Sequence, residues 1–222
     1  MPEDSELSAA VQDYAKAIYT LESEGEAAST TALAERLDVR PASVSGMLRK
    51  LAALELVVHE PYRGVRLTER GRAVALEVIR HHRLLELFLV ESLGMGWDEV
   101  HAEAERLEHV LSEQLEELIA AKLGNPTLDP HGDPIPSREL TIAEDTSRTL
   151  YELEPGQQAT FARVSDHDPE MLRFLGERGI APGERLELLE RQPFDGPVYV
   201  RVGDQVHVLG ALLARSMRVE VT

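Results

Sequence analysis

Residues 31–68 read TALAERLDVR PASVSGMLRK LAALELVVHE PYRGVRLT, and this stretch decides the fold of the N-terminal third. A short helix is predicted over residues 32–37, capped by Thr30 or Thr31, and a tight turn follows at residues 38–40. Pro41 suits the first turn of a second helix that runs to about Leu54. Two short strands, 56–59 and 65–68, enclose a hairpin loop. Helix, turn, helix and hairpin in this order predict a winged helix-turn-helix.

The predicted helix 41–54 has two different faces. Val44, Leu51 and their neighbours form an apolar stripe, while the opposite face is small and basic. Small residues let a helix approach the major groove, and Arg or Lys reaches phosphates or guanine edges. For one helix alone, a merely solvated face is an equal alternative; the preceding helix, the turn and the basic hairpin favour DNA binding. The residues expected to contact DNA are Arg40, Ala42, Ser43, Ser45, Gly46, Arg49 and Lys50, with Arg63 on the wing.

Outward from this stretch, further helices are predicted over 7–22, 68–93 and 98–123, the last capped by Asp98. After a proline-rich loop at 126–136, the pattern changes to short strands at 158–164, 185–190, 198–202 and 205–209, with one helix at 169–178. The expected fold is mainly α with a small β part. It comprises a winged-helix domain (1–73), a helical domain (74–140), a linker (141–153) and an SH3-like β-barrel (154–222).

The charge of the chain is unevenly distributed. The net charge of -17 argues against nucleic acid, but residues 36–72 hold eight Arg or Lys against four Asp or Glu. Residues 74–139 hold five basic and fourteen acidic residues. The first segment therefore suits phosphates and the second suits cations. No apolar run approaches the roughly 18 residues of a membrane span, and the polar N-terminus is unlike a signal peptide, so we expect a cytoplasmic protein.

Histidines and carboxylates gather on the two predicted helices of the acidic segment. His82 and Glu86 are four residues apart, and His101, Glu105, Glu108 and His109 span about 100° of one face if 98–123 is a single helix. An exposed charged stripe is the alternative, particularly for His82 and Glu86 alone. Apolar residues beside the second group favour a divalent-cation site. The chain has no cysteine, so any such site uses oxygen and imidazole ligands.

An enzyme is the remaining alternative for this cluster. Helical di-metal oxidases place His three residues after Glu, whereas His109 lies four residues after Glu105. The chain also lacks His-Glu-x-x-His, Gly-x-Ser-x-Gly and P-loop motifs. We therefore expect no enzyme and no organic substrate.

The order of these features resembles the diphtheria-toxin-repressor family over essentially the whole chain. The residues that carry the resemblance are the winged helix, HRLLE at 82–86, VHAEAERLEH at 100–109 and PHGDPIP at 130–136. The resemblance implies a metal-activated homodimer that represses transcription from palindromic operator DNA and binds two metal ions per subunit.

The resemblance also implies which residues hold the metal ions. The primary site would use Asp13, Glu105, Glu108 and His109, where iron-responsive members place a Met and a Cys among the ligands. The second site would use His82, Glu86 and His101, with Asp166 and Asp168 from the SH3-like domain. Manganese regulators without a third domain carry a further Glu where this chain has Lys16, so their two-metal arrangement is in doubt here.

The ligand types favour manganese. Sulfur ligands favour iron, whereas oxygen and imidazole suit Mn²⁺; Fe²⁺, Co²⁺ or Zn²⁺ could fill the same ligands. Without metal, the carboxylates of Asp13, Glu105 and Glu108 are expected to repel one another. The winged-helix domain would then be held loosely. Because His must be neutral to bind metal, activation is expected to fail toward about pH 6. The alternatives are an Fe²⁺-activated repressor and a metal-independent winged-helix regulator.

Overall fold

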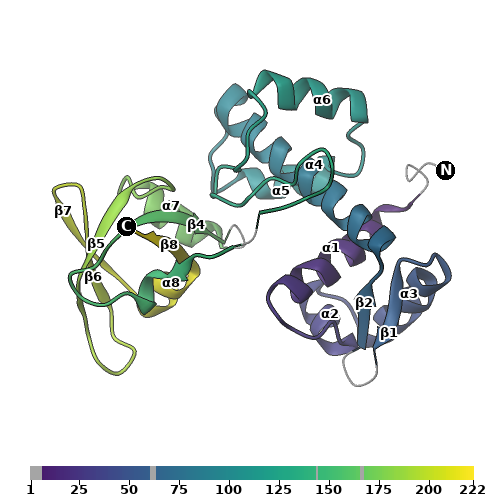
Figure 1. Cartoon of the computed structure of the whole chain (residues 1–222), viewed down its shortest axis with the longest axis horizontal. Helices are drawn as coiled ribbons and strands as arrows, with labels where there is room; N and C mark the ends of the chain where they lie inside the picture. Colours follow the sequence, from purple (N-terminus) through teal and green to yellow (C-terminus); the bar gives the residue numbers. More distant parts are fainter. Residues whose placement is uncertain (1–6, 61–63, 144, 166–167) are drawn as a thin grey trace. The chain divides into compact units, whose positions relative to one another are not determined.

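The computed structural model describes residues 7–60, 64–143, 145–165 and 168–222 (Figure 1). The chain divides into two compact units. The N-terminal unit comprises Met1–His82, Glu108–Leu111 and Pro136–Thr141, and the C-terminal unit comprises Arg83–Leu107, Ser112–Ile135 and Ile142–Thr222. The chain thus passes between the units several times, and a short turn at 108–111 belongs to the N-terminal unit.

The N-terminal unit has the predicted winged helix-turn-helix. Its elements are α1 (Ala9–Ser23), α2 (Thr30–Arg36), α3 (Pro41–Ala53), β1 (Val57–Glu60), β2 (Gly64–Leu67) and the first part of α4 (Glu69–Leu93). α1, α2 and α3 pack on one another around fully buried Ile18, Leu33 and Leu51. β1 and β2 pair antiparallel, with Val57 opposite Leu67. Burial of this apolar stripe fixes α3 in place and leaves its small, basic face exposed.

Local chemistry sets the ends of these elements. Ser29, not Thr30 or Thr31, caps α2, because its Oγ accepts the Ala32 amide at 3.1 Å. Pro41 occupies the first turn of α3 as predicted. Gly64 begins β2 with φ of 90°, and a Cβ there would lie 2.2 Å from the Ala28 carbonyl oxygen, so only glycine fits.

The prediction of one helix over 98–123 is wrong. α5 (Val100–Leu107) ends before Glu108, and α6 (Glu113–Lys122) begins a new helical register. Ser112 caps α6 by accepting the Leu115 amide at 3.3 Å, and a cap of this kind ends any preceding helix. Glu108 and His109 therefore lie in the turn between the helices, and their expected place on one helical face is corrected.

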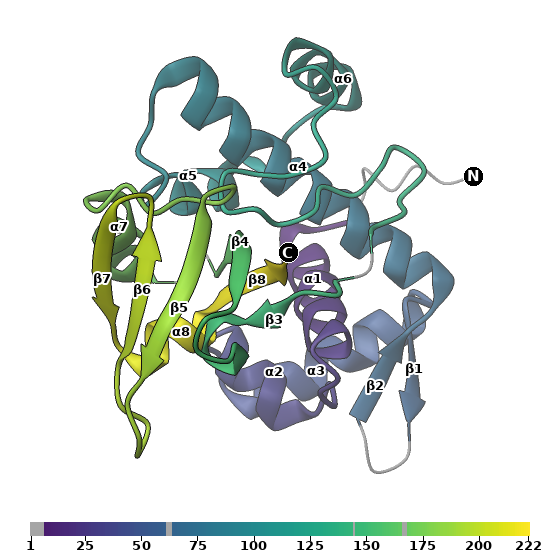
Figure 2. The ribbon, with the colours of Figure 1, turned by 60° about the vertical axis from the view of Figure 1, so that its left-hand side comes forward.

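The C-terminal unit contains a six-stranded antiparallel sheet in the order β3-β8-β4-β5-β6-β7 (Figure 2). Its strands are β3 (Arg148–Thr149), β4 (Gln158–Val164), β5 (Arg185–Arg191), β6 (Val198–Val202), β7 (Gln205–Leu209) and β8 (Met217–Val221). Register shifts within the β4–β8 and β5–β6 pairings bend the sheet. The predicted strands are present, while β3, β8, the 3₁₀ turn Leu150–Glu152 and α8 (Ala211–Ser216) were not predicted.

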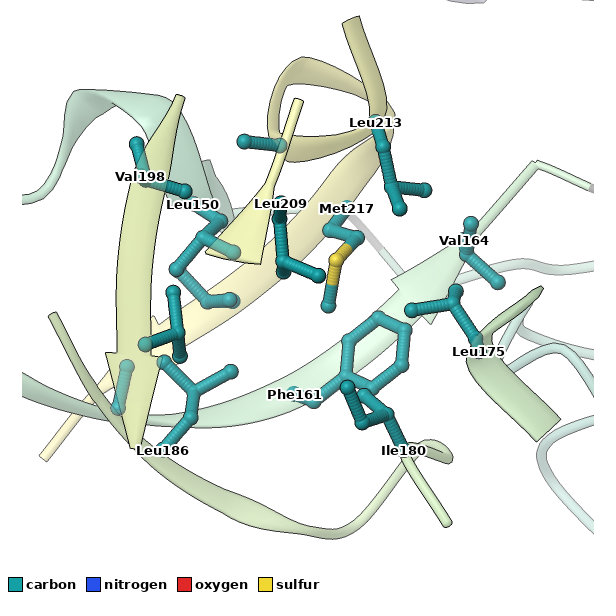
Figure 3. Close-up of a cluster of buried hydrophobic side chains, with 14 of the residues drawn as sticks. Leu150, Phe161, Val164, Leu175, Ile180, Leu186, Val198, Leu209, Leu213 and Met217 are labelled. Carbon is teal, nitrogen blue, oxygen red and sulfur yellow. The ribbon is translucent and has the colours of Figure 1, made fainter. Parts of the chain in front are cut away.

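The curved sheet wraps around one apolar core, as expected for an SH3-like barrel. Figure 3 shows Phe161, Leu175, Ile180 and Met217 pointing toward one another in this core, and all four are fully buried. Leu175 comes from α7 (Pro169–Gly176). Leu150 and Leu153 are also buried here, and Arg148–Thr149 pairs with β8, so the C-terminal end of the predicted linker belongs to the barrel. In the described part of the chain, no helix is long and apolar enough to cross a membrane.

Candidate metal centre and DNA interface

Three predicted metal ligands meet in the N-terminal unit, and we call Asp13, Glu108 and His109 the primary cluster. Asp13 lies on α1, whereas the other two lie in the turn after α5. His109 Nε2 is 2.8 Å from Asp13 Oδ1 and 3.4 Å from Glu108 Oε1. The Glu108 side chain is fully buried, and Asp13 is 39 % exposed. Two carboxylates and one imidazole converging in this way suit a hard or borderline divalent cation.

The orientation of the His109 ring is fixed by a residue that the sequence did not single out. Gln12 Oε1 lies 2.8 Å from His109 Nδ1 and accepts its N–H in the neutral tautomer that leaves Nε2 facing the carboxylates. The hydrogen bond to Asp13 raises the pKa of His109, against an opposing effect of burial. Gln12 precedes Asp13 in the sequence, and only the position of the turn at 108–111 reveals its contact with His109.

Glu108 also receives two nitrogen-bearing side chains. The Lys16 ammonium lies 2.9 Å from Oε2 and 3.0 Å from Oε1, and His82 Nδ1 lies 2.5 Å from Oε2. His81 is also buried, and its Nδ1 lies 3.1 Å from the Glu108 carbonyl oxygen. The expectation that unbalanced carboxylates repel one another without metal is therefore corrected for Glu108, because Lys16 supplies a counter-charge.

A second group of possible ligands lies in the C-terminal unit: Glu86, Asp129 and His131, which we call the second cluster. All three are buried. His131 Nε2 lies 2.7 Å from the Trp97 carbonyl oxygen, to which it donates its N–H. His131 Nδ1 is buried, makes no hydrogen bond and lies 3.6 Å from Glu86 Oε2. An imidazole nitrogen and a carboxylate that face each other in a dry site fit a divalent cation.

Burial and charge shift the titration of the second cluster. Burial, together with the nearby charges of Asp133 and Glu86, raises the pKa of Asp129 to about 7 against the opposing charge of Arg83. Burial lowers the pKa of His131, but the nearby carboxylates of Glu86 and Asp129 outweigh it and raise this pKa to about 9. Shifts of this size mark a functional-site candidate, because they show ionisable groups held together away from water.

Backbone packing holds His131 in place. The His131 carbonyl oxygen accepts the Val164 amide at 3.0 Å, which ties the loop to β4. Gly132 has φ of 87°, and a Cβ there would lie 1.9 Å from the Ala162 carbonyl oxygen. Asp129 and His131 were not predicted as ligands, although His131 belongs to the loop 130–136 that carried the family resemblance. A histidine two residues after an aspartate in a glycine-containing loop was the available signal.

The other predicted ligands have varied positions. His101 Nδ1 lies 3.4 Å from Glu86 Oε1, so these two come together as predicted. Glu105 is an exposed residue of α5 in the C-terminal unit. Asp168 caps α7, its Oδ1 accepting the amides of Glu170 and Met171. Asp166 lies outside the described residues.

The predicted DNA-reading face is available on α3. Arg40, Ala42, Ser43, Ser45, Gly46, Arg49 and Lys50 are all exposed. A Cβ at Gly46 would meet no atom within 4 Å, so the surface there is open to a close approach. Arg49 Nε donates to the Ser45 carbonyl oxygen at 3.3 Å, which keeps the guanidinium along the helix. Arg63 lies outside the described residues.

Three family models match most of the chain. Residues 6–65 match "Iron dependent repressor, N-terminal DNA binding domain", residues 68–137 match "Iron dependent repressor, metal binding and dimerisation domain", and residues 148–221 match "FeoA domain". The iron-dependent repressor IdeR of Mycobacterium tuberculosis is 35% identical, and the alignment covers 97% of this chain and 99% of that protein.

Solved structures are also similar. A manganese-dependent transcriptional repressor in complex with manganese is 42% identical with a TM-score of 0.89, covering 96% of this chain and 100% of that chain. ScaR with bound Cd²⁺ is 31% identical with a TM-score of 0.81, covering 95% and 98%.

Proposed function

The chain belongs to the iron-dependent repressor family and is a metal-dependent DNA-binding transcriptional repressor, for which we propose Mn²⁺ as the activating ion. The family comprises repressors and not enzymes, so the expectation that the chain is not an enzyme is confirmed. Its domains include one for DNA binding and one for metal binding and dimerisation, which support operator DNA and a second copy of the chain as partners.

The single observation that carries the choice of manganese is the donor set of the primary cluster. Asp13, Glu108 and His109 offer only oxygen and imidazole, and the chain has no cysteine that could add sulfur. Such ligands suit Mn²⁺, whereas thiolate or thioether ligands favour softer or later metals. The manganese-dependent repressor at 42% identity supports the same choice, while the name of IdeR keeps iron as the alternative.

Two ions per subunit are proposed. Glu105, on α5, would complete the primary cluster as a fourth ligand. In the second site, Glu86 is the shared ligand, and His101 and His131 both face it. His82 lies one helical turn before Glu86 on α4 and remains a proposed ligand. Asp129 is added to this set, and Asp166 and Asp168 stay as proposed ligands from the barrel domain.

The primary cluster offers a route from metal to DNA within the N-terminal unit. A divalent ion would supply the charge that holds both carboxylates together. Asp13 lies on α1, which packs on α2 and α3, so fixing Asp13 against Glu108 and His109 restrains the helices that carry the DNA-reading face. In a homodimer this restraint would set the separation of two α3 helices to match a palindromic operator. The DNA-competent arrangement is then the one that binds the ion better.

Exposed leucines offer one candidate face for the second copy of the chain. Leu115 and Leu118 on α6 are 48% and 61% exposed, and their spacing of three residues places them on one side of the helix. Neighbouring apolar side chains that form an exposed patch often mark a protein interface. We assign the α6 face to the proposed dimer.

The choice of ion is tested by anaerobic titration of the purified chain with Mn²⁺ and, separately, Fe²⁺. Fluorescence anisotropy reports binding to a palindromic duplex selected from random sequence by the metal-loaded protein. We expect titration with Mn²⁺ to raise the affinity for this duplex to its maximal value. Activation by Fe²⁺ with no response to Mn²⁺ would reject manganese and favour the iron alternative.

A further inference from the structure

Lys16 contacts the buried carboxylate of the primary cluster. Lys16 lies on α1, three residues after Asp13, and its ammonium contacts both oxygens of Glu108, at 2.9 and 3.0 Å. The same nitrogen lies 3.4 Å from His82 Nδ1. The Lys16 side chain is 21% exposed and that of Glu108 is fully buried. The ammonium therefore lies between a carboxylate and an imidazole, two groups that commonly bind metal ions.

The ion pair between Lys16 and Glu108 must compete with a metal ion for the same carboxylate. A buried carboxylate without a counter-charge is unfavourable, and the Lys16 ammonium supplies that charge in the metal-free protein. A divalent ion that takes the Glu108 oxygens must displace the ammonium. Lysine has a long flexible stem, and this one is partly exposed, so its head can move into solvent when the ion binds. Binding is then an exchange of one cation for another.

We propose that Lys16 is an internal competitor that weakens metal binding at the primary cluster and restricts that cluster to one divalent ion. The inference rests on the proposed metal site. The competition follows from the shared carboxylate of Glu108, because a metal ion and the ammonium cannot both hold the same oxygens. The restriction follows from the side chain itself, since the displaced ammonium stays tethered to α1 near the cluster, where it offers no ligand to a second ion and repels it. Lys16 thus sets the metal concentration at which the repressor responds.

The test uses the full-length chain and isothermal titration with Mn²⁺ alone, without DNA. Lys16→Met keeps the apolar stem and removes the charge, and we expect it to bind Mn²⁺ about tenfold more tightly than the wild type. Lys16→Arg keeps a positive charge and should show no such gain. The control Arg185→Met, at an exposed residue that begins β5, should leave Mn²⁺ affinity unchanged.

A second variant tests the restriction of the primary cluster to one ion. Lys16→Glu places a carboxylate where the ammonium lies, and we expect the number of Mn²⁺ ions bound per subunit to rise by one. A purely structural lysine gives a different pattern, in which Lys16→Met lowers the melting temperature of the metal-free protein but does not tighten Mn²⁺ binding.

Two results would overturn the inference: Mn²⁺ affinity of Lys16→Met equal to or weaker than that of the wild type in a folded protein, or an unchanged ion count in Lys16→Glu. If circular dichroism shows that Lys16→Met is unfolded, Lys16→Gln replaces it with the same two outcomes. The titration measures Mn²⁺ binding alone, so it is independent of any effect on DNA. If the wild type binds Mn²⁺ but a separate DNA-binding measurement shows no change in affinity, the proposed function is contradicted and the role of Lys16 is not. A wild type that binds no Mn²⁺ contradicts both.

Discussion

At the residue scale, one buried carboxylate organises the primary cluster. Glu108 contacts Lys16 and His82 and lies 3.4 Å from His109 Nε2, so the positions of three other side chains depend on it. The sequence predicted Glu108 and His109 as ligands on one helix face, whereas the structure places both in the turn between α5 and α6. Asp13 was found only through the family resemblance, since an exposed acidic residue on a helix carries no signal of its own.

Three other residues in or beside the two clusters were not predicted from the sequence. Gln12, Asp129 and His131 act through contacts between segments far apart in the chain, and periodicity reports only neighbours on one element. His131 is the clearest case: its role depends on the Trp97 carbonyl and on Glu86, and both lie more than thirty positions away.

Glu105 tests the choice of ion at this scale. Glu105→Cys replaces an oxygen donor with a thiolate, which prefers Fe²⁺ over Mn²⁺. We expect the ratio of Fe²⁺ to Mn²⁺ activation, measured by anisotropy under anaerobic conditions, to rise in the variant. Glu103→Cys, on the same helix two residues earlier, is the control for adding a thiol. A metal ranking that is the same in both variants and the wild type would refute the role of Glu105.

Asp145 tests the stability of the barrel domain against pH. Burial raises the pKa of Asp145, but hydrogen bonds from Ser147 and Arg163 outweigh it and lower this pKa to about 2. A group whose pKa is lowered by folding stabilises the protein above its unfolded pKa of about 3.9 and loses that contribution as the pH falls toward 2. Asp145→Asn should therefore be less stable than the wild type at pH 7, with a difference that shrinks below about pH 4.

Urea unfolding at pH 7 and at pH 3 measures that difference. Asp204→Asn, an exposed residue between β6 and β7, is the control and should match the wild type at both values. If Asp145→Asn lowers the free energy of unfolding by the same amount at both pH values, the carboxylate does not act through its charge.

At the element scale, helices were predicted well where one apolar stripe spans the whole segment. α3 begins at Pro41 and α4 ends at Leu93, both as predicted, because each buries a continuous face. The segment 98–123 is different. Its apolar pattern continues through 108–112, but Ser112 caps a new helix and the buried Glu108 lies in the turn. Strands β3 and β8 were missed because a two-residue strand and a C-terminal strand give little periodicity.

The exposed face of α3 gives the prediction at this scale. Lys50→Ala removes a phosphate-binding charge, so DNA affinity should fall by a similar factor for specific and non-specific duplexes. The slope of log affinity against log salt should decrease by about 1. Fluorescence anisotropy over a range of KCl concentrations measures both, with the exposed residue Arg185→Ala on β5 as the control. An unchanged salt slope in Lys50→Ala would mean that this lysine does not meet the DNA backbone.

At the scale of the whole molecule, the charge pattern and the fold agree. The chain has a net charge of -17, yet residues 36–72 of the winged helix hold more basic than acidic residues. An acidic protein with one basic surface should bind DNA through that surface and be repelled elsewhere, which suppresses non-specific binding. Composition thus predicted both activities, DNA binding and cation binding, whereas the two clusters and their partners needed the three-dimensional structure.

The central claim is that the ion at the primary cluster controls DNA affinity, and the most direct test is the affinity of the wild type for its operator with Mn²⁺ and with chelator. Coupling of about 1–3 kcal/mol predicts a 5- to 150-fold gain with Mn²⁺. Asp13→Ala should lose most of this gain, and Asp204→Asn should retain it. Equal affinities of the wild type with Mn²⁺ and with chelator would contradict the account.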